Sequence, residues 1–207
     1  NRDGSLDNQV VEHEWGHYLS NRLVGNGSGL GTQQASGMGE GWSDFVAQLL
    51  TVRATDINVP ANANWNGVYT TGAYAAIALT TNSSYFGIRR VPYSTDMTKD
   101  PLTFKHIGNG NSIVPPFAGP CDSSLGTCNG SNNAEVHATG EVWATMLWEC
   151  FAALLRDTQG ATPRLTFDQA RDRMRNYLVA SLKLTPVNPT VLEARDAVIS
   201  MGIVRRK

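Results

Sequence analysis

Apolar positions recur at helical spacing in five stretches of the chain and lose that period between them. The clearest stretches are residues 8–23, with apolar side chains close to one helical face, and the longer, more apolar residues 134–157. The helices that the pattern predicts span residues 8–23, 40–54, 134–157, 166–184 and 188–202. Strands are not evident, so we expect a mainly α fold.

Local signals support the ends of these helices. Asp7 or Asn8 can cap the first helix. Thr166, followed three residues later by Gln169, has the spacing of a capping box. Pro189 provides a natural start for the last helix.

Between the helices the sequence favours loops. Residues 24–39 are rich in Gly and Ser, and residues 55–133 carry turn signals such as NANWNG and NGNS without a clear period. Irregular stretches as long as the second usually serve a function. We therefore expect one lobe over residues 1–207, with a loop region at 55–133 and a helical part at 134–203.

Composition and charge narrow the class of protein. At 207 residues and 41% hydrophobic, the chain can bury a core, which excludes an intrinsically disordered protein. The 17 Lys and Arg nearly balance the 18 Asp and Glu, so no net field attracts nucleic acid or an anionic membrane. No apolar run is long enough to span a bilayer, and we expect neither nucleic acid nor membrane as a partner.

The cysteines favour an exported protein. Cys121 and Cys128 bracket a short polar loop that a disulfide can close, and Cys150 lies in an apolar run that predicts a buried free thiol. Three unpaired thiols in a cytosolic protein are the alternative. The chain opens at Asn1 with no initiator Met and no signal peptide, so we expect a processed product preceded by another segment.

The sharpest chemical signal is the HExxH motif that runs from His13 to His17. Residues four apart lie on one face of a helix, so His13 and His17 can hold one metal ion together. Glu14 is turned about 100° from His13, which suits it to reach a metal-bound water rather than the ion.

A catalytic zinc site needs a third protein ligand. Glu40 lies 23 residues beyond His17 at the start of the second predicted helix, and Asp44 follows one turn later on the same face. From there Asp44 can accept a hydrogen bond from a ligand imidazole. In the alternative interpretation, Glu40 only complements a helix N-terminus and Asp44 is solvated.

Four segments together resemble the fungalysin family of secreted zinc metallopeptidases, which are relatives of the thermolysin-like enzymes. They read HEWGHYLSNRLVG, SGMGEGWSDF, GIRRVPYSTD and EVHATGEVW, in the order of the family, and the resemblance runs from about residue 1 to the last helix. It implies the helical C-terminal lobe of a thermolysin-like metallopeptidase with long loops.

The resemblance also implies roles for single residues. It implies a Zn²⁺ ion held by His13, His17 and Glu40, with Glu14 as the general base. It further implies that His137 faces the developing oxyanion.

Arg89 is expected, by the same resemblance, to donate to a substrate backbone carbonyl, with Arg90 as the alternative. One departure is that residues 19–39 contain no Tyr, although thermolysin-like enzymes use one in that loop. Oxyanion stabilisation then depends on His137 and zinc, or on Tyr93 as a replacement.

These expectations combine into a secreted, extracellular zinc endopeptidase that acts on proteins or peptides. The family's upstream lobe supplies an edge strand for substrate pairing, so we expect an upstream lobe or propeptide of the same precursor as a partner. Two alternatives stay open: a trimmed or metal-stapled lobe that binds peptides without efficient turnover, and a zinc hydrolase for a non-peptide bond.

Overall fold

The computed structural model describes residues 2–113, 121–123 and 126–204. Six α-helices run through these residues: α1 Asn8–Leu23, α2 Gln33–Thr51, α3 Ser83–Phe86, α4 Val136–Arg156, α5 Phe167–Leu184 and α6 Val191–Val204. Short 3₁₀ turns lie at Gly4–Leu6, Gly25–Gly27, Ala54–Asn58, Pro60–Trp65, Ala75–Ala78 and Phe104–Ile107. The β-structure of the described residues is one isolated antiparallel bridge, between Tyr69 and Tyr93. The mainly α prediction is confirmed.

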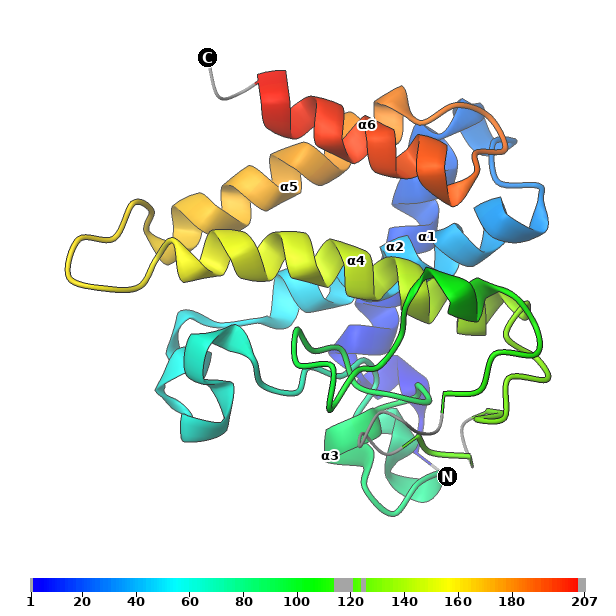
Figure 1. Ribbon diagram of the computed structural model, residues 1–207, viewed down its shortest axis with the longest axis horizontal. Coiled ribbons are helices and arrows are strands. Elements are labelled where there is room, and N and C mark those ends of the chain that lie inside the picture. The colour runs from blue at the N-terminus through cyan, green and yellow to red at the C-terminus, as the bar shows by residue number, and fades with distance from the viewer. Residues whose placement is uncertain (1, 114–120, 124–125, 205–207) are drawn as a thin grey trace.

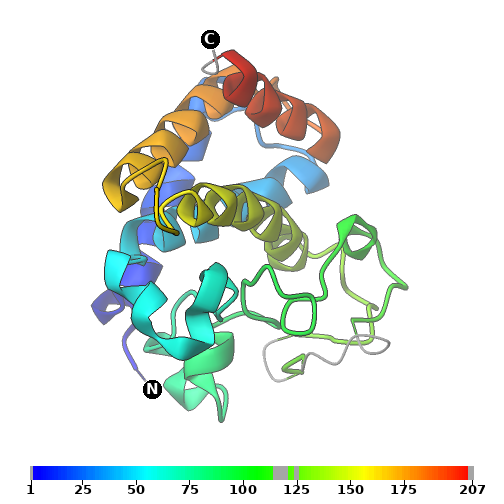
Figure 2. The same cartoon turned by 60° about the vertical axis from the view of Figure 1, so that its left-hand side comes forward.

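The helices stack around α4, which crosses the middle of the molecule (Figure 1). α2 packs against both α1 and α4, while α5 packs on α4 and α6. The loop region between α2 and α4 lies on the opposite side of α4 from α5 and α6, as both views show (Figures 1 and 2). α1 and α2 are thereby held together beside the start of α4.

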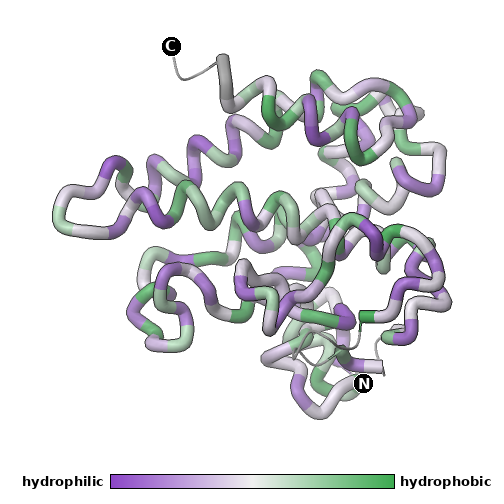
Figure 3. Tube along the Cα trace, viewed as in Figure 1, coloured by the Kyte–Doolittle hydropathy of each residue, from purple (hydrophilic) through white to green (hydrophobic). Residues whose placement is uncertain are grey.

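The hydrophobic core joins α2 to α4 through large aromatic side chains. Trp42 meets Trp143 edge to face with ring centroids 5.6 Å apart, and Phe45 meets Phe151 in the same way at 6.3 Å. α5 adds one apolar face to this core and leaves hydrophilic positions outside, so the colours alternate along it (Figure 3).

α2 begins at Gln33, seven residues before the predicted start, so the prediction of a loop over residues 24–39 is wrong for its second half. Thr32 caps the helix by accepting a hydrogen bond from the Ala35 N–H. The extra turns contain Gly37 and Gly39, whose poor helix propensity concealed them. Glu40 therefore lies inside the helix rather than at its N-terminus.

The remaining helix ends agree closely with the sequence signals. Asp7 caps α1, and Thr166 and Gln169 form the expected capping box at α5. α6 starts at Val191 after Thr190, whose side chain bonds to Glu193, so the expected start at Pro189 is two residues early.

One of the two cysteine predictions is confirmed and the other is wrong. Cys121 and Cys128 form the predicted disulfide. Cys150 is exposed, so the prediction of a buried thiol is wrong. The apolar run around it supplies the buried Trp148 and Phe151, while position 150 faces outwards. None of the helices in the described part of the chain could cross a membrane.

Candidate metal centre

The centre begins at a close contact between α1 and α2. The side of α1 that faces the protein carries His13, Gly16 and Ser20, whereas Trp15 and Tyr18 are half-exposed or more. A Cβ atom on Gly16 would lie 2.6 Å from the Cα atom of Ser43, so only glycine allows this approach. α1 therefore turns its polar HExxH face, not an apolar one, towards α2.

Three side chains meet at this contact. His13 Nε2 and His17 Nε2 lie 3.1 Å apart. Glu40 Oε2 is 3.3 Å from His13 Nε2, and Glu40 Oε1 is 3.5 Å from His17 Nε2. Within the described ranges, these three residues form the one group of His, Cys, Asp or Glu side chains spaced to hold a metal ion.

The surroundings of Glu40 favour its charged form. Burial alone would raise the pKa of Glu40, but His13 and His17 hold that pKa well below its ordinary value, so the carboxylate is ionised. Its Oε2 atom is buried without a hydrogen-bond partner in the described part of the chain. A buried anionic oxygen without a hydrogen-bond donor is unusual in native proteins, and a bound cation would compensate its charge.

Asp44 orients the first imidazole. Its Oδ1 atom lies 2.7 Å from His13 Nδ1, which leaves Nε2 facing Glu40. Burial lowers the pKa of His13, but the hydrogen bond to Asp44 and the nearby Glu40 carboxylate outweigh burial and raise that pKa to about 9. The predicted partnership between Asp44 and a ligand imidazole is therefore present in the geometry.

Glu14 has the opposite environment. It is exposed, and it makes no hydrogen bond or ion pair to any residue that the structure describes. It follows His13 directly on α1 and is not one of the three clustered residues.

His137 lies in the first turn of α4, and its side chain approaches Glu40 from that helix. Its Nε2 atom is 3.5 Å from Glu40 Oε2, and its Nδ1 atom is 2.7 Å from Glu135 Oε1. Glu135 also caps α4 by accepting from the His137 and Ala138 N–H groups. Glu135 is not among the residues predicted from the sequence, although an acid two residues before a candidate histidine at a helix start is a usable signal.

Arg89 binds the Asp44 carboxylate through two of its nitrogen atoms. Its Nε and Nη2 atoms donate to the two Asp44 oxygens at 2.5 and 2.8 Å, and Nη2 lies 3.9 Å from Glu40 Oε2. Arg90 is buried in bonds to Glu141 and Asn133, away from the cluster, so it is not available as the alternative donor.

Tyr93 does not replace the missing loop tyrosine. It is fully buried, and its hydroxyl donates to Asp44 Oδ2 at 2.5 Å. The hydroxyl is therefore engaged behind the ligand cluster instead of facing the open side where a substrate would lie.

Comparison with known proteins decides the family. The family model of the fungalysin metallopeptidases (M36) matches residues 1–205. This chain belongs to the fungalysin family. The resemblance to that family, first seen in four short segments, is thus confirmed over nearly the whole chain.

Individual fungal relatives agree with the family match. The chain is 34% identical over 212 residues to "Extracellular metalloproteinase mep" of Aspergillus niger, which covers 98% of this chain and 28% of that protein. It is 34% identical over 209 residues to "Extracellular metalloproteinase 9" of Uncinocarpus reesii, covering 96% of this chain and 27% of the relative. The fungalysin chain described here thus spans somewhat over a quarter of the length of these relatives.

Proposed function

We propose that this chain holds one zinc ion through His13, His17 and Glu40 and hydrolyses peptide bonds. A tetrahedral zinc ion with bonds of about 2.0–2.1 Å has ligand atoms roughly 3.3 Å apart. The corresponding separations here are 3.1, 3.3 and 3.5 Å. This match is the observation that carries the proposal, together with membership in a metallopeptidase family.

The donor set also suits catalysis rather than a purely structural ion. Two imidazoles and one carboxylate leave a fourth position open, as in catalytic zinc sites. A zinc ion held there supplies Lewis acidity and makes a water molecule a stronger acid. A structural site would have no use for an acidic residue such as Glu14, which follows a ligand directly and is exposed and unpaired within the described residues.

Glu14 is the general base in this proposal. Because it is exposed and unpaired among the described residues, its carboxylate can take a proton from the attacking water and deliver it to the leaving amine. Glu40 cannot take that part, since its two oxygens face the two ligand imidazoles. The base and ligand roles therefore fall to different carboxylates.

His137 stabilises the oxyanion that develops on the substrate carbonyl. Glu135 holds the ring through Nδ1, and Nε2, 3.5 Å from Glu40 Oε2, is placed to donate a hydrogen bond to that oxyanion. Asp44 orients His13, and Arg89 anchors Asp44. A direct bond from Arg89 to a substrate carbonyl, as the family resemblance implies, remains a prediction.

The substrates and partners follow from the same assignment. We propose protein or peptide substrates, secretion to the extracellular space, and cooperation with an upstream lobe or propeptide of the same precursor. Relatives named as extracellular metalloproteinases support the first two points, and the share of their length that this chain covers supports the third.

Casein digestion with and without a metal chelator tests the proposal. We expect the chelator to abolish cleavage and added zinc to restore it, because the site has no substitute for the ion. Cleavage that survives complete metal removal would overturn the proposal. Binding of peptides without any cleavage in the zinc-loaded protein would favour the non-catalytic alternative instead.

A further inference from the structure

Asp44 is the point where the metal centre meets the loop region. Its side chain is only 1% exposed, and three residues bond to it, one from α1 and two from the loop region. Oδ1 takes His13 Nδ1 at 2.7 Å and Arg89 Nη2 at 2.8 Å. Oδ2 takes Arg89 Nε and the Tyr93 hydroxyl, each at 2.5 Å. Each carboxylate oxygen therefore accepts two hydrogen bonds.

This arrangement fixes how the carboxylate is turned. A buried carboxylate is costly unless donors satisfy it. Arg89 donates one hydrogen bond to each oxygen, so it holds the carboxylate without favouring Oδ1 or Oδ2. The Tyr93 hydroxyl donates to Oδ2 alone, whereas His13 binds Oδ1. The two hydrogen bonds together fix the rotation of the carboxylate, so that Oδ1 faces His13.

The backbone holds Tyr93 in place for this contact. The Tyr69 N–H donates to the Tyr93 carbonyl at 3.0 Å, and the Tyr93 N–H donates to the Tyr69 carbonyl at 2.8 Å. This antiparallel pair is the isolated bridge of the fold. A residue of the loop region is thus pinned at the back of the metal centre.

We propose that Tyr93 is a positioning residue that sets metal affinity by holding Asp44 against His13. This inference rests on the proposed zinc site. Tyr93 touches neither a ligand atom nor the open side of the cluster, and it acts only through the Asp44 carboxylate. Partners of this kind fix the tautomer and direction of a ligand imidazole, and losing one typically weakens metal binding about 10–100-fold.

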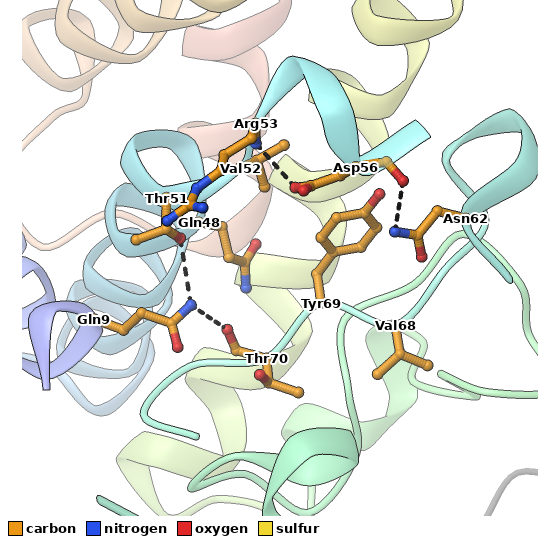
Figure 4. Close-up of a pocket in the computed structure, with 10 residues that line it drawn as sticks. All are labelled: Gln9, Gln48, Thr51, Val52, Arg53, Asp56, Asn62, Val68, Tyr69 and Thr70. Atoms are coloured by element: carbon orange, nitrogen blue, oxygen red, sulfur yellow. Dashed lines mark hydrogen bonds between the residues drawn. The ribbon is translucent and has the colours of Figure 1, made fainter. Parts of the chain in front are cut away.

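The chain contains a matched control in Tyr69, the other half of the bridge. Its side chain is also buried, at 8% exposed, but its hydroxyl has no hydrogen-bond partner in the part of the chain that the structure describes. Figure 4 shows the Tyr69 ring between Gln48 and Asp56 in a pocket whose lining does not include Asp44 or Tyr93. Both tyrosines can lose a hydroxyl and keep a ring.

The test compares Tyr93→Phe with Tyr69→Phe. Zinc affinity is measured by competition with a chromophoric chelator, and thermal unfolding of the metal-free protein is followed alongside. We expect Tyr93→Phe to weaken zinc binding at least tenfold. Tyr69→Phe should leave zinc affinity within twofold of wild type. Equal zinc affinity of Tyr93→Phe and wild type would overturn the inference.

A double variant tests whether Tyr93 acts through Asp44. If it does, Tyr93→Phe should cost little further zinc affinity in an Asp44→Asn background, because the effects of coupled residues do not add. Full additivity would overturn the route through Asp44, and so would equal loss of zinc affinity in both tyrosine variants.

The outcomes separate this inference from the proposed function. A wild-type protein that binds zinc and cleaves peptide, with a Tyr93→Phe variant of unchanged affinity, refutes the inference alone. A wild-type protein that binds no zinc refutes both. If Tyr93→Phe also lowers the unfolding temperature of the metal-free protein, the double variant still tests the route through Asp44. A general loss of stability would weaken zinc binding equally with and without the Asp44 carboxylate, whereas an effect through Asp44 would not.

Discussion

Two carboxylates near the same imidazoles differ because of where they lie on their helices. The Glu40 side chain is 14% exposed and faces both ligand imidazoles, whereas Glu14 is exposed and unpaired within the described residues. One environment suits a ligand and the other suits a base that exchanges protons with water.

Glu14→Gln should therefore keep the metal and lose hydrolysis. General-base catalysis contributes roughly 10²–10⁴-fold, so we expect kcat to fall by about that factor. Glu40→Gln is the control, and it should lose zinc affinity as well as activity. Metal content by mass spectrometry and peptide hydrolysis measure the two effects. Equal metal loss in both variants would show that the roles are divided wrongly.

Glu135 gives a second prediction at this scale. Glu135→Gln weakens a charge-assisted hydrogen bond to His137 Nδ1, which is worth about 1.5 kcal/mol, so kcat/KM should fall about tenfold. Zinc affinity should not change, because Glu135 does not contact His13, His17 or Glu40. Glu149→Gln, on the exposed side of α4, is the control for both measurements. Loss of zinc affinity in Glu135→Gln would contradict its assignment to His137.

The sequence predicts the residues of the site better than the contacts between them. Spacing alone places His13 and His17 on one face, because helix geometry is local. The two partners of Asp44 from the loop region could not be predicted in the same way. Arg89 and Tyr93 reach it from a loop region without periodicity, and only the folded chain decides which donors a buried carboxylate receives.

At the scale of the elements, glycine explains both a wrong prediction and the way α2 meets α4. Helix propensity counts Gly41 as unfavourable, yet a Cβ atom there would lie 2.5 Å from the Gly140 carbonyl oxygen. On Gly140 a Cβ atom would lie 2.6 Å from the Cβ atom of Glu40. The backbones of α2 and α4 therefore approach closely beside Glu40, the proposed metal ligand. Helix propensity scales do not include such contacts between helices.

Gly41→Ala should therefore destabilise the protein by about 1–3 kcal/mol, as overpacking does in a close contact. Gly39→Ala is a matched control two residues away, because its Cβ atom would meet only Leu30 at 3.5 Å. That substitution should be neutral or stabilise the helix by up to about 1 kcal/mol. Chemical denaturation of both variants measures the difference. Similar stabilities would mean that the α2–α4 contact relaxes without cost.

The cysteines give a prediction about the surface of α4 and the adjacent loop. An alkylating reagent without reductant should modify the exposed Cys150 in the folded protein and leave Cys121 and Cys128 unmodified. Mass spectrometry after digestion identifies the labelled sites. Labelling of all three cysteines before reduction would refute the disulfide and weaken the argument for export.

For the whole molecule, the order of the five long helices follows from the periodic pattern, which misses only the single turn of α3 among the α-helices of the described residues. Substrate alignment depends on structure that this pattern does not supply. The described residues contain one isolated bridge, and both of its tyrosines are buried. Within them, no strand edge is presented to pair with an extended peptide. The proposed ligands and base nevertheless lie on this chain, so the reacting groups and the alignment of the substrate can be separated experimentally.

We expect the 207-residue chain, loaded with zinc, to cleave peptides more slowly than a longer protein that also carries the proposed upstream lobe. Misplacing a substrate by about 1 Å can cost on the order of 10²-fold in rate, so kcat/KM should fall by a comparable factor. Zinc affinity should be the same in both proteins, since His13, His17 and Glu40 are all present. Peptide hydrolysis and chelator competition on the two proteins measure these quantities. Equal kcat/KM would show that the cleft is complete without an upstream lobe, because alignment would then come from this chain's own loops.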